Sequence, residues 1–298
     1  MFRLNYEKKD LGPSYSIAVA VMIVMSIVLG LIFGSDASGW QFWLMQALFT
    51  LFIGGSAALY AFMTKTNLLV ATKLNVKPKY AHVLWGCLAV TFLIACMTPI
   101  NNVLLDGIER SGLERPSVNL ESNLVGLLVV ASLLPAFCEE LVFRGTVAQS
   151  LVGSKSKLAA LAISGGLFAL YHANPAQTVH QFVLGAFLTL LVFRSGSLWT
   201  SVIAHLFNNV LVVVLSYTPL GAEEFWSFSA NTGVATACLC VGIVGFAACV
   251  FGYIKTTKSV WQEVSEEKAS KSSVGSLVAL AVAVVVSATL WFTTLFGL

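Results

Sequence analysis

The chain has 298 residues, of which 57% are hydrophobic and only 10% are charged, and its mean hydropathy is +0.85. This composition excludes a soluble globular domain and a disordered chain, and a net charge of +3 gives no reason to expect a nucleic acid partner. We therefore expect an all-α membrane protein, a polytopic bundle of eight to nine transmembrane helices.

Apolar windows long enough to cross a bilayer, near or above about 18 residues, recur along the chain. They predict nine spans: Tyr15–Phe33, Trp40–Met63, Tyr80–Pro99, Leu124–Leu151, Leu158–His172, Val179–Phe193, Leu198–Tyr217, Gly233–Ile254 and Val274–Leu298. The fifth and sixth windows are short, which suits segments that line a cavity and do not face lipid on every side. The first is too long for a secretory signal, so we interpret it as a true span.

The basic residues are distributed unevenly between the two sides of this arrangement. Fifteen of them fall on one side if the spans alternate in direction: Arg3, Lys8, Lys9, Lys65, Lys73, Lys77, Lys79, Arg144, Lys155, Lys157, Arg194, Lys255, Lys258, Lys268 and Lys271. The other side has only Arg110 and Arg115. Because cytoplasmic loops carry the excess of Lys and Arg, we predict a cytoplasmic N-terminus and an external C-terminus. We expect a bacterial cell membrane, because the sequence shows no organelle address.

The fourth span contains three charged residues, although a charge at mid-bilayer costs at least about 2.5–3.5 kcal/mol. Glu140 and Arg144 are four residues apart, so they share a helix face and can form an ion pair that fixes the helix. Glu139 lies about 100° round the helix and cannot be neutralised in the same way. Pro135 removes a backbone hydrogen bond one turn earlier and predicts a kink or a loosened turn there. We therefore interpret Glu140 and Arg144 as structural and Glu139 as a functional candidate.

Two further spans carry polar residues that could meet Glu139. His172 ends the fifth span, and His205 and Asn209 share one face of the seventh. Taken singly, each has an ordinary structural explanation, as a helix-end histidine or as interhelical hydrogen-bond partners. A rise of 1.5 Å per residue, however, places them at compatible depths, so the three helices can direct all four side chains at one site.

The other two histidines are weaker candidates. His82, near the start of the third span, is interpreted as interfacial, and His180, with no acidic neighbour in the sequence, is interpreted as structural.

The ordered set of motifs resembles the CAAX-protease and bacteriocin-processing family (CPBP, also abbreviated ABI) of intramembrane endopeptidases. The residues that carry the resemblance are Glu139-Glu140-x-x-x-Arg144, Phe168-x-x-x-His172 and His205-x-x-x-Asn209, with support from Phe182-x-x-Gly185 and Gly196-Ser197-Leu198-Trp199. The match runs from Ser132 to about Leu215. It suggests three regions: an N-terminal three-span region (1–123), a catalytic core (124–217) whose site lies on spans four, five and seven, and a C-terminal two-span region (218–298). A ninth span departs from the eight-helix plan of the family.

The resemblance implies roles that suit peptide hydrolysis by an activated water. Glu139 would be the general base and His172 would help to hold the water. His205 and Asn209 would stabilise the oxyanion, and the Glu140–Arg144 pair would hold the helix in place.

A metal-dependent version of this chemistry remains open, with zinc held by His172, His205 and Glu139. We favour a glutamate-dependent mechanism without an obligatory metal, because the sequence has no H-E-x-x-H motif and each of these ligands lies on its own helix. Cys138 is a poor nucleophile candidate, since adjacent helix residues point in different directions and Glu139 could not serve as its base.

The predicted function is therefore hydrolysis of membrane-associated or hydrophobic peptides, or of membrane proteins, by a chain surrounded by membrane lipid. One alternative is a non-catalytic relative that acts as a membrane scaffold or a bacteriocin self-immunity protein. A proton-coupled transporter is a weaker alternative, because the sequence shows no convincing internal repeat. Neither the substrate nor the oligomeric state follows from the sequence.

Overall fold

A computed structural model describes residues 2–34, 37–114, 123–154, 156–221, 223–259 and 272–297 of the chain. Apart from one isolated bridge between Arg3 and Thr66, the regular structure of these residues is helical. Four basic residues used in the topology prediction lie outside the described residues, as does the end of the predicted ninth span: Arg115, Lys155, Lys268, Lys271 and Leu298.

The helices follow one another in a simple order along the chain. The α-helices are α1 (Leu11–Phe33), α2 (Trp40–Met63), α3 (Leu68–Ala71), α4 (Tyr80–Arg110), α5 (Leu124–Leu128), α6 (Leu134–Val142), α7 (Lys157–Tyr171), α8 (Thr178–Ser195), α9 (Leu198–Ser216), α10 (Glu223–Trp226), α11 (Phe228–Thr256) and α12 (Val274–Phe296). Short turns of other helix types complete the fold: η1 (Lys8–Asp10), η2 (Val129–Leu133), η3 (Phe143–Val147), η4 (Ala148–Leu151) and η5 (Pro219–Gly221).

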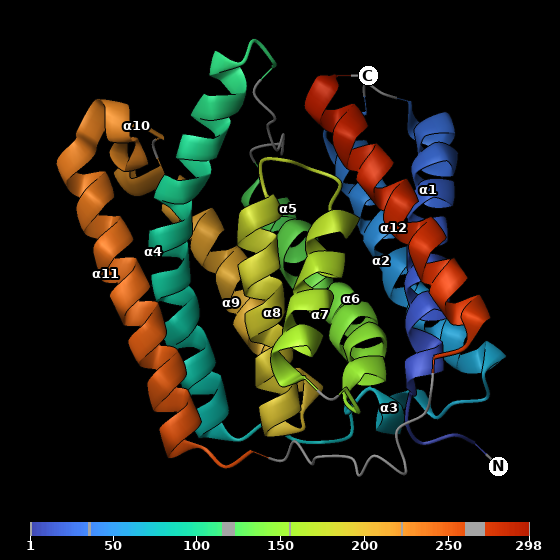
Figure 1. The fold of residues 1–298 in the computed structure, drawn as a ribbon. Helices are drawn as coiled ribbons and strands as arrows, with labels where there is room; N and C mark the ends of the chain where they lie inside the picture. Colours follow the sequence, from blue (N-terminus) through green and yellow to red (C-terminus); the bar gives the residue numbers. More distant parts are fainter. Residues whose placement is uncertain are drawn as a thin grey trace.

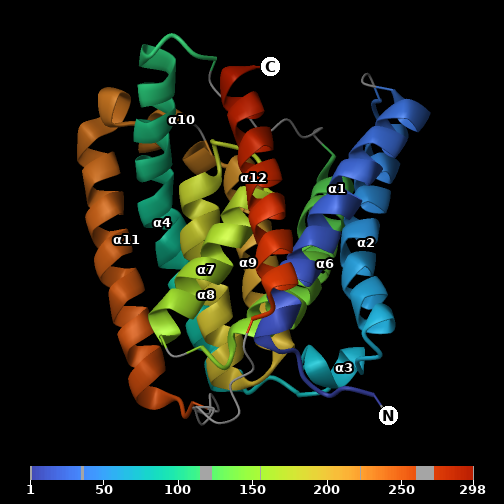
Figure 2. The same ribbon diagram turned by 45° about the vertical axis from the view of Figure 1, so that its right-hand side comes forward.

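The long helices form three groups side by side (Figures 1 and 2). Helix α11 packs along α4 on one flank, α1, α2 and α12 form the other flank, and α6 to α9 fill the centre. Two buried apolar clusters hold these groups together, one centred on α1, α6 and α7 and the other on α4, α8 and α11. The chain begins and finishes at opposite ends of the bundle, as both views show. The central helices are therefore enclosed on two sides.

The described residues contain eight helices long and apolar enough to cross a membrane, together with the shorter apolar helix α7. The predicted all-α polytopic fold is confirmed. One boundary is wrong: the third span does not stop at Pro99, because α4 continues to Arg110. A proline removes a single backbone hydrogen bond, and the long contact with α11 keeps α4 helical through Pro99. Helix α11 is kinked at Asn231, where φ is −146° and ψ is 66°, so its uninterrupted part begins close to the predicted start at Gly233.

The predicted fourth span, Leu124–Leu151, is one continuous run of unequal helical turns. The wide π-helical turns η2 and η3 lie on either side of α6, and the first of them comes directly before Pro135. This is the loosened turn that the proline predicts. Wide turns of this kind rotate the side chains that follow and are frequent at functional sites. The first of them, η2, precedes α6 and so affects the direction of Glu139 and Glu140.

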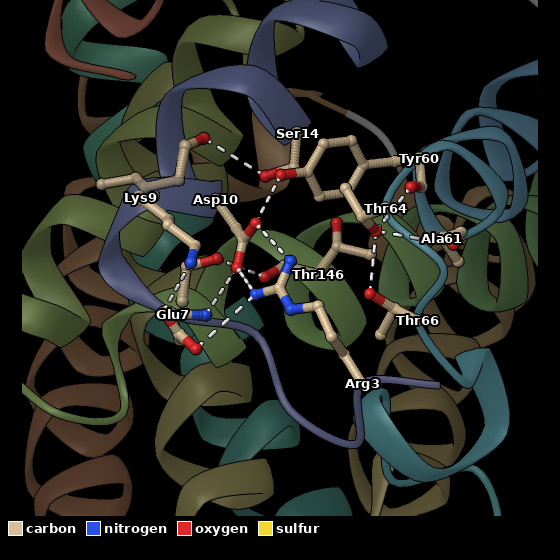
Figure 3. Close-up of polar contacts among 12 residues, drawn as sticks. Arg3, Glu7, Lys9, Asp10, Ser14, Tyr60, Ala61, Thr64, Thr66 and Thr146 are labelled. Atoms are coloured by element: carbon tan, nitrogen blue, oxygen red, sulfur yellow. Dashed lines mark hydrogen bonds and ion pairs between the residues drawn. The ribbon is translucent and has the colours of Figure 1, made fainter. Parts of the chain in front are cut away.

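A partly buried ion pair between Arg3 and Asp10, joined by Tyr60 of α2, links the N-terminal end of α1 to α2 (Figure 3). The Asp10 carboxylate, only 2% exposed, accepts hydrogen bonds from the Arg3 guanidinium at 2.6 and 3.1 Å and from the Tyr60 hydroxyl at 2.7 Å. The backbone N–H of Arg3 also donates to the Lys65 carbonyl at 2.9 Å. Arg3 thus has a structural partner in addition to its place in the topology count.

Helix α12, the predicted ninth span, packs against α1 through small and polar residues. The Ser276 hydroxyl accepts from the Gly12 N–H at 3.2 Å, and the Tyr15 and Ser287 hydroxyls bond at 3.1 Å. These contacts lie far from the charged residues of α6 in the sequence. They make α12 a packing helix of the outer flank.

Helices α7 and α8 approach closely at Gly165, and this contact gives a first testable prediction. A Cβ on Gly165 would lie 2.5 Å from the Phe182 carbonyl oxygen, whereas a Cβ on the adjacent Gly166 meets nothing nearer than a Phe182 ring carbon at 3.9 Å. We expect Gly165→Ala to lower the free energy of unfolding by about 1–3 kcal/mol, because overpacking forces the helices apart. Gly166→Ala is the matched control and should be neutral or slightly stabilising. Thermal unfolding of both variants in detergent measures the difference, and equal melting temperatures would contradict it.

Candidate active site

Helix α6 and the turn after it bury an ion pair without solvent contact. Arg144 Nη1 donates to Glu140 Oε1 at 2.7 Å, and both side chains are 0% exposed. The Arg144 guanidinium also lies 4.1 Å above the centre of the Phe168 ring, a favourable cation–π position. The guanidinium fits there because residue 185 is a glycine, and a Cβ at that position would lie only 3.2 Å from Arg144 Nη2. The sequence-predicted pair therefore exists and links α6 to α7 and α8.

The Glu139 side chain points from the same helix in a different direction and lies near two histidines. Its Oε2 lies 3.8 Å from His172 Nε2 and 4.0 Å from His205 Nε2. The Glu139 side chain is 18% exposed and that of His172 is 15% exposed, whereas His205 is buried. The structure thus brings together three of the four residues expected to converge, on a partly open site within an apolar bundle.

The hydrogen bonds on the far side of each imidazole fix its tautomer. His172 Nδ1 lies 2.8 Å from the Phe168 carbonyl oxygen, and His205 Nδ1 lies 3.0 Å from Glu140 Oε1. A carbonyl oxygen and an ionised carboxylate can only accept, so both Nδ1 atoms carry the proton. In the neutral ring each Nε2 then presents a lone pair towards Glu139. Glu140 has a task that the sequence did not reveal, because it orients His205 as well as pairing with Arg144.

Glu139 Oε2 and the Nε2 lone pair of His172 are two acceptors that face each other at 3.8 Å and need a shared donor. A water at hydrogen-bond length, about 2.8 Å, donates to two acceptors separated by up to roughly 4.6 Å, so the spacing at Glu139 suits a water. Two ligands of a tetrahedral zinc ion, at about 2.0–2.1 Å each, lie only about 3.4 Å apart. The separations of 3.8 and 4.0 Å are too wide for zinc as the side chains stand. Among the described residues, no group of three His, Cys, Asp or Glu residues is arranged to hold a metal ion.

Asn209 lies one helical turn beyond His205 on α9 and faces the backbone of η2. Its Nδ2 donates to the Ser132 carbonyl at 3.4 Å, and its Oδ1 accepts from Asn208 Nδ2 at 3.0 Å. Ser132 lies in η2, seven residues before Glu139 in the same continuous span. Asn209 therefore joins α9 to the span that carries Glu139, and the structure shows no direct bond between Asn209 and Glu139.

The structure gives each of the other two histidines a partner on a different helix. His180, interpreted as structural, lies in α8 with its Nε2 3.2 Å from Asn208 Oδ1. Its partner is an amide on another helix, so no local sequence signal reveals it. His82 lies near the start of α4, where it is buried and its Nδ1 bonds to the Tyr253 hydroxyl at 2.9 Å. Cys138 packs against Gly54 of α2, away from Glu139.

Comparison with known proteins points to the same stretch of the chain. A family model described as "Type II CAAX prenyl endopeptidase Rce1-like" matches residues 121–211. A protein of Bacillus subtilis (strain 168) named "Putative membrane peptidase YdiL" is 26% identical over 94 residues, which are 32% of this chain and 38% of that relative. The aligned stretch is therefore well under two thirds of the relative's length. Together with the apolar helices, these matches confirm that the chain is a multi-pass membrane protein whose residues 121–211 resemble the CAAX-protease and bacteriocin-processing family of membrane peptidases.

Proposed function

We propose that the protein is an intramembrane endopeptidase that hydrolyses membrane-associated or hydrophobic peptides with a glutamate-activated water. The observation that carries the proposal is the position of Glu139 Oε2 3.8 Å from His172 Nε2, whose lone pair is free because the Phe168 carbonyl holds the Nδ1 proton. Such a set of acceptors binds and orients a water, which is the nucleophile that peptide hydrolysis needs. The resemblance of residues 121–211 to membrane peptidases supports the same chemistry.

In the proposed reaction Glu139 takes one proton from the water while His172 Nε2 accepts a hydrogen bond from the other. The resulting hydroxide attacks the carbonyl carbon of the peptide bond, and the carbonyl oxygen becomes an oxyanion. Glu139 then passes its proton to the leaving nitrogen as the C–N bond breaks, which returns the carboxylate to its starting state. His172 keeps its Nε2 lone pair for this task because the Phe168 carbonyl holds its Nδ1 proton.

The oxyanion would be stabilised by donors on α9. Asn209 Nδ2 has a second N–H besides the one directed to Ser132. His205 can donate through Nε2 only in its doubly protonated form, and the Glu140 carboxylate at 3.0 Å stabilises that cation. A cationic donor in a site screened from water is well suited to a developing negative charge.

The orientation and location of the protein are part of the proposal. The distribution of Lys and Arg supports a cytoplasmic N-terminus, and an odd number of crossings agrees with termini at opposite ends of the bundle. The proposed location is a bacterial cell membrane, and the proposed partners are membrane lipid and a peptide or membrane-protein substrate.

The test is peptide cleavage by the full chain reconstituted in lipid vesicles. The panel contains unmodified hydrophobic peptides and farnesylated peptides of the same sequence, and mass spectrometry detects new termini. We expect the wild-type protein to cleave at least one peptide and His172→Ala to reduce kcat by roughly 10²-fold or more, since the water loses one of its anchors. Elemental analysis of the same preparations should show activity that does not follow zinc content.

The alternative of a non-catalytic scaffold predicts a different result. Wild-type protein and His172→Ala would then both leave every peptide intact, and both would retain the same biological phenotype in cells. That pair of outcomes would overturn the catalytic proposal even for a normally folded protein.

A further inference from the structure

A chain of three hydrogen bonds crosses from α8 through α9 to the backbone before α6. His180 Nε2 lies 3.2 Å from Asn208 Oδ1, Asn208 Nδ2 lies 3.0 Å from Asn209 Oδ1, and Asn209 Nδ2 lies 3.4 Å from the Ser132 carbonyl oxygen. Asn208 is 5% exposed and Ser132 is fully buried. The hydrogen-bond chain ends at the backbone of η2, in the span that carries Glu139, and it includes Asn209, one of the two proposed oxyanion donors. Neither His180 nor Asn208 has a role in the reaction proposed above.

The direction of this chain is fixed from its Ser132 end. A carbonyl oxygen only accepts, so the Asn209 amide must turn its NH₂ group towards Ser132 and its oxygen towards Asn208. Asn208 must then offer its own NH₂ group to Asn209, which leaves its oxygen facing His180. His180 completes the chain as a donor through Nε2–H. If the oxygen and NH₂ group of either Asn side chain exchanged places, two acceptors or two donors would face each other.

This direction matters because an amide has only one end that can stabilise an oxyanion. With Oδ1 held by Asn208 and one N–H held by Ser132, the second N–H of Asn209 is the group left to face the site. A free Asn side chain presents its oxygen almost as readily, and an oxygen would repel the developing negative charge. The ordered amide needs no reorganisation at the moment of reaction.

We propose that His180 and Asn208 are positioning residues that hold the Asn209 amide with its N–H towards the oxyanion. The inference rests on the proposed function and adds to it the residues that set the polarity of one oxyanion donor. It also gives α8 a part in the site through His180.

The first test compares His180→Phe, which removes the donor, with His180→Gln, which restores an N–H at similar reach. Loss of a whole oxyanion donor costs about 10²–10³ in kcat, so loss of its orientation should cost about tenfold, with KM unchanged because the bond forms only in the transition state. His180→Gln should recover most of that loss. Asn208→Asp should be at least as harmful as His180→Phe, because it removes the donor that holds Asn209 Oδ1.

A double-mutant cycle separates this role from simple packing. If His180 acts through Asn209, His180→Phe should have no further effect on kcat in an Asn209→Ala background. Ser164→Ala, which removes the buried 2.8 Å bond between Ser164 and Thr189 of α8, is the control for loosened helix packing and should leave kcat unchanged. Additive effects of the two substitutions in the cycle, or no rescue by His180→Gln, would overturn the inference.

Failure of the proposed function gives a different pattern. If the wild-type protein cleaves no peptide, the peptidase proposal is wrong. The hydrogen-bond chain is then tested by the same double-mutant cycle, with the free energy of unfolding measured in place of kcat. A coupling free energy between His180 and Asn209 would support the hydrogen-bond chain, and strictly additive effects of the two substitutions would contradict it.

Discussion

Glu139→Gln is expected to reduce kcat for peptide hydrolysis by at least about 10³-fold and to leave the melting temperature nearly unchanged. The substitution keeps the size and polarity of the side chain but removes the base that accepts the proton of the water. Glu139 is 18% exposed, and Arg144 is already paired with Glu140, so the loss of its charge leaves no buried cation without a partner. The measurement is vesicle cleavage combined with thermal unfolding in detergent.

Cys138→Ala is the matched control for Glu139→Gln. It alters the adjacent residue on α6, whose side chain packs against Gly54 of α2 and does not face the histidines. We expect this variant to keep its activity, which would also exclude a thiol nucleophile. Retained activity in Glu139→Gln together with loss of activity in Cys138→Ala would reverse the assignment.

The helices could be predicted from sequence because membrane spans are set by local composition. Each long apolar run of Leu, Val, Ala and Ile became a helix, and the bounds of α2, Trp40–Met63, coincide with the prediction. Pro99 misled the prediction because its effect depends on a neighbour, α11, that lies more than a hundred residues away in the chain. The Arg3–Asp10–Tyr60 cluster was invisible for the same reason, since Tyr60 reaches Asp10 from another helix.

The site could be predicted only where its geometry is local. The spacing of four residues was enough to pair Glu140 with Arg144 and to separate Glu139 from both. The bond between Glu140 and His205 joins residues 65 positions apart and depends on how α9 is rotated against α6, which no periodicity reveals. The role assigned to Glu140 changed accordingly, from a structural partner alone to a residue that also sets the tautomer of a histidine.

These two tasks of Glu140 can be separated by a pair of substitutions. Glu140→Gln alone leaves the fully buried Arg144 without a counter-charge, and we expect it to lower the free energy of unfolding by about 3–5 kcal/mol. Combining Glu140→Met with Arg144→Met removes both charges, and a buried pair replaced by apolar residues of similar volume is often neutral for stability. The methionine at position 144 can also pack on the Phe168 ring that now lies under the guanidinium.

The Glu140→Met/Arg144→Met variant should therefore fold about as stably as the wild-type protein and still lose activity, by roughly 10²-fold or more. His205 loses the carboxylate that holds its Nδ1 proton and stabilises its doubly protonated form, so the oxyanion loses its cationic donor. Equilibrium unfolding in detergent and vesicle cleavage on the same preparations measure the two effects separately. A stable variant with full activity would show that Glu140 is purely architectural, whereas a stable but inactive one assigns the catalytic loss to His205, because the architecture is intact.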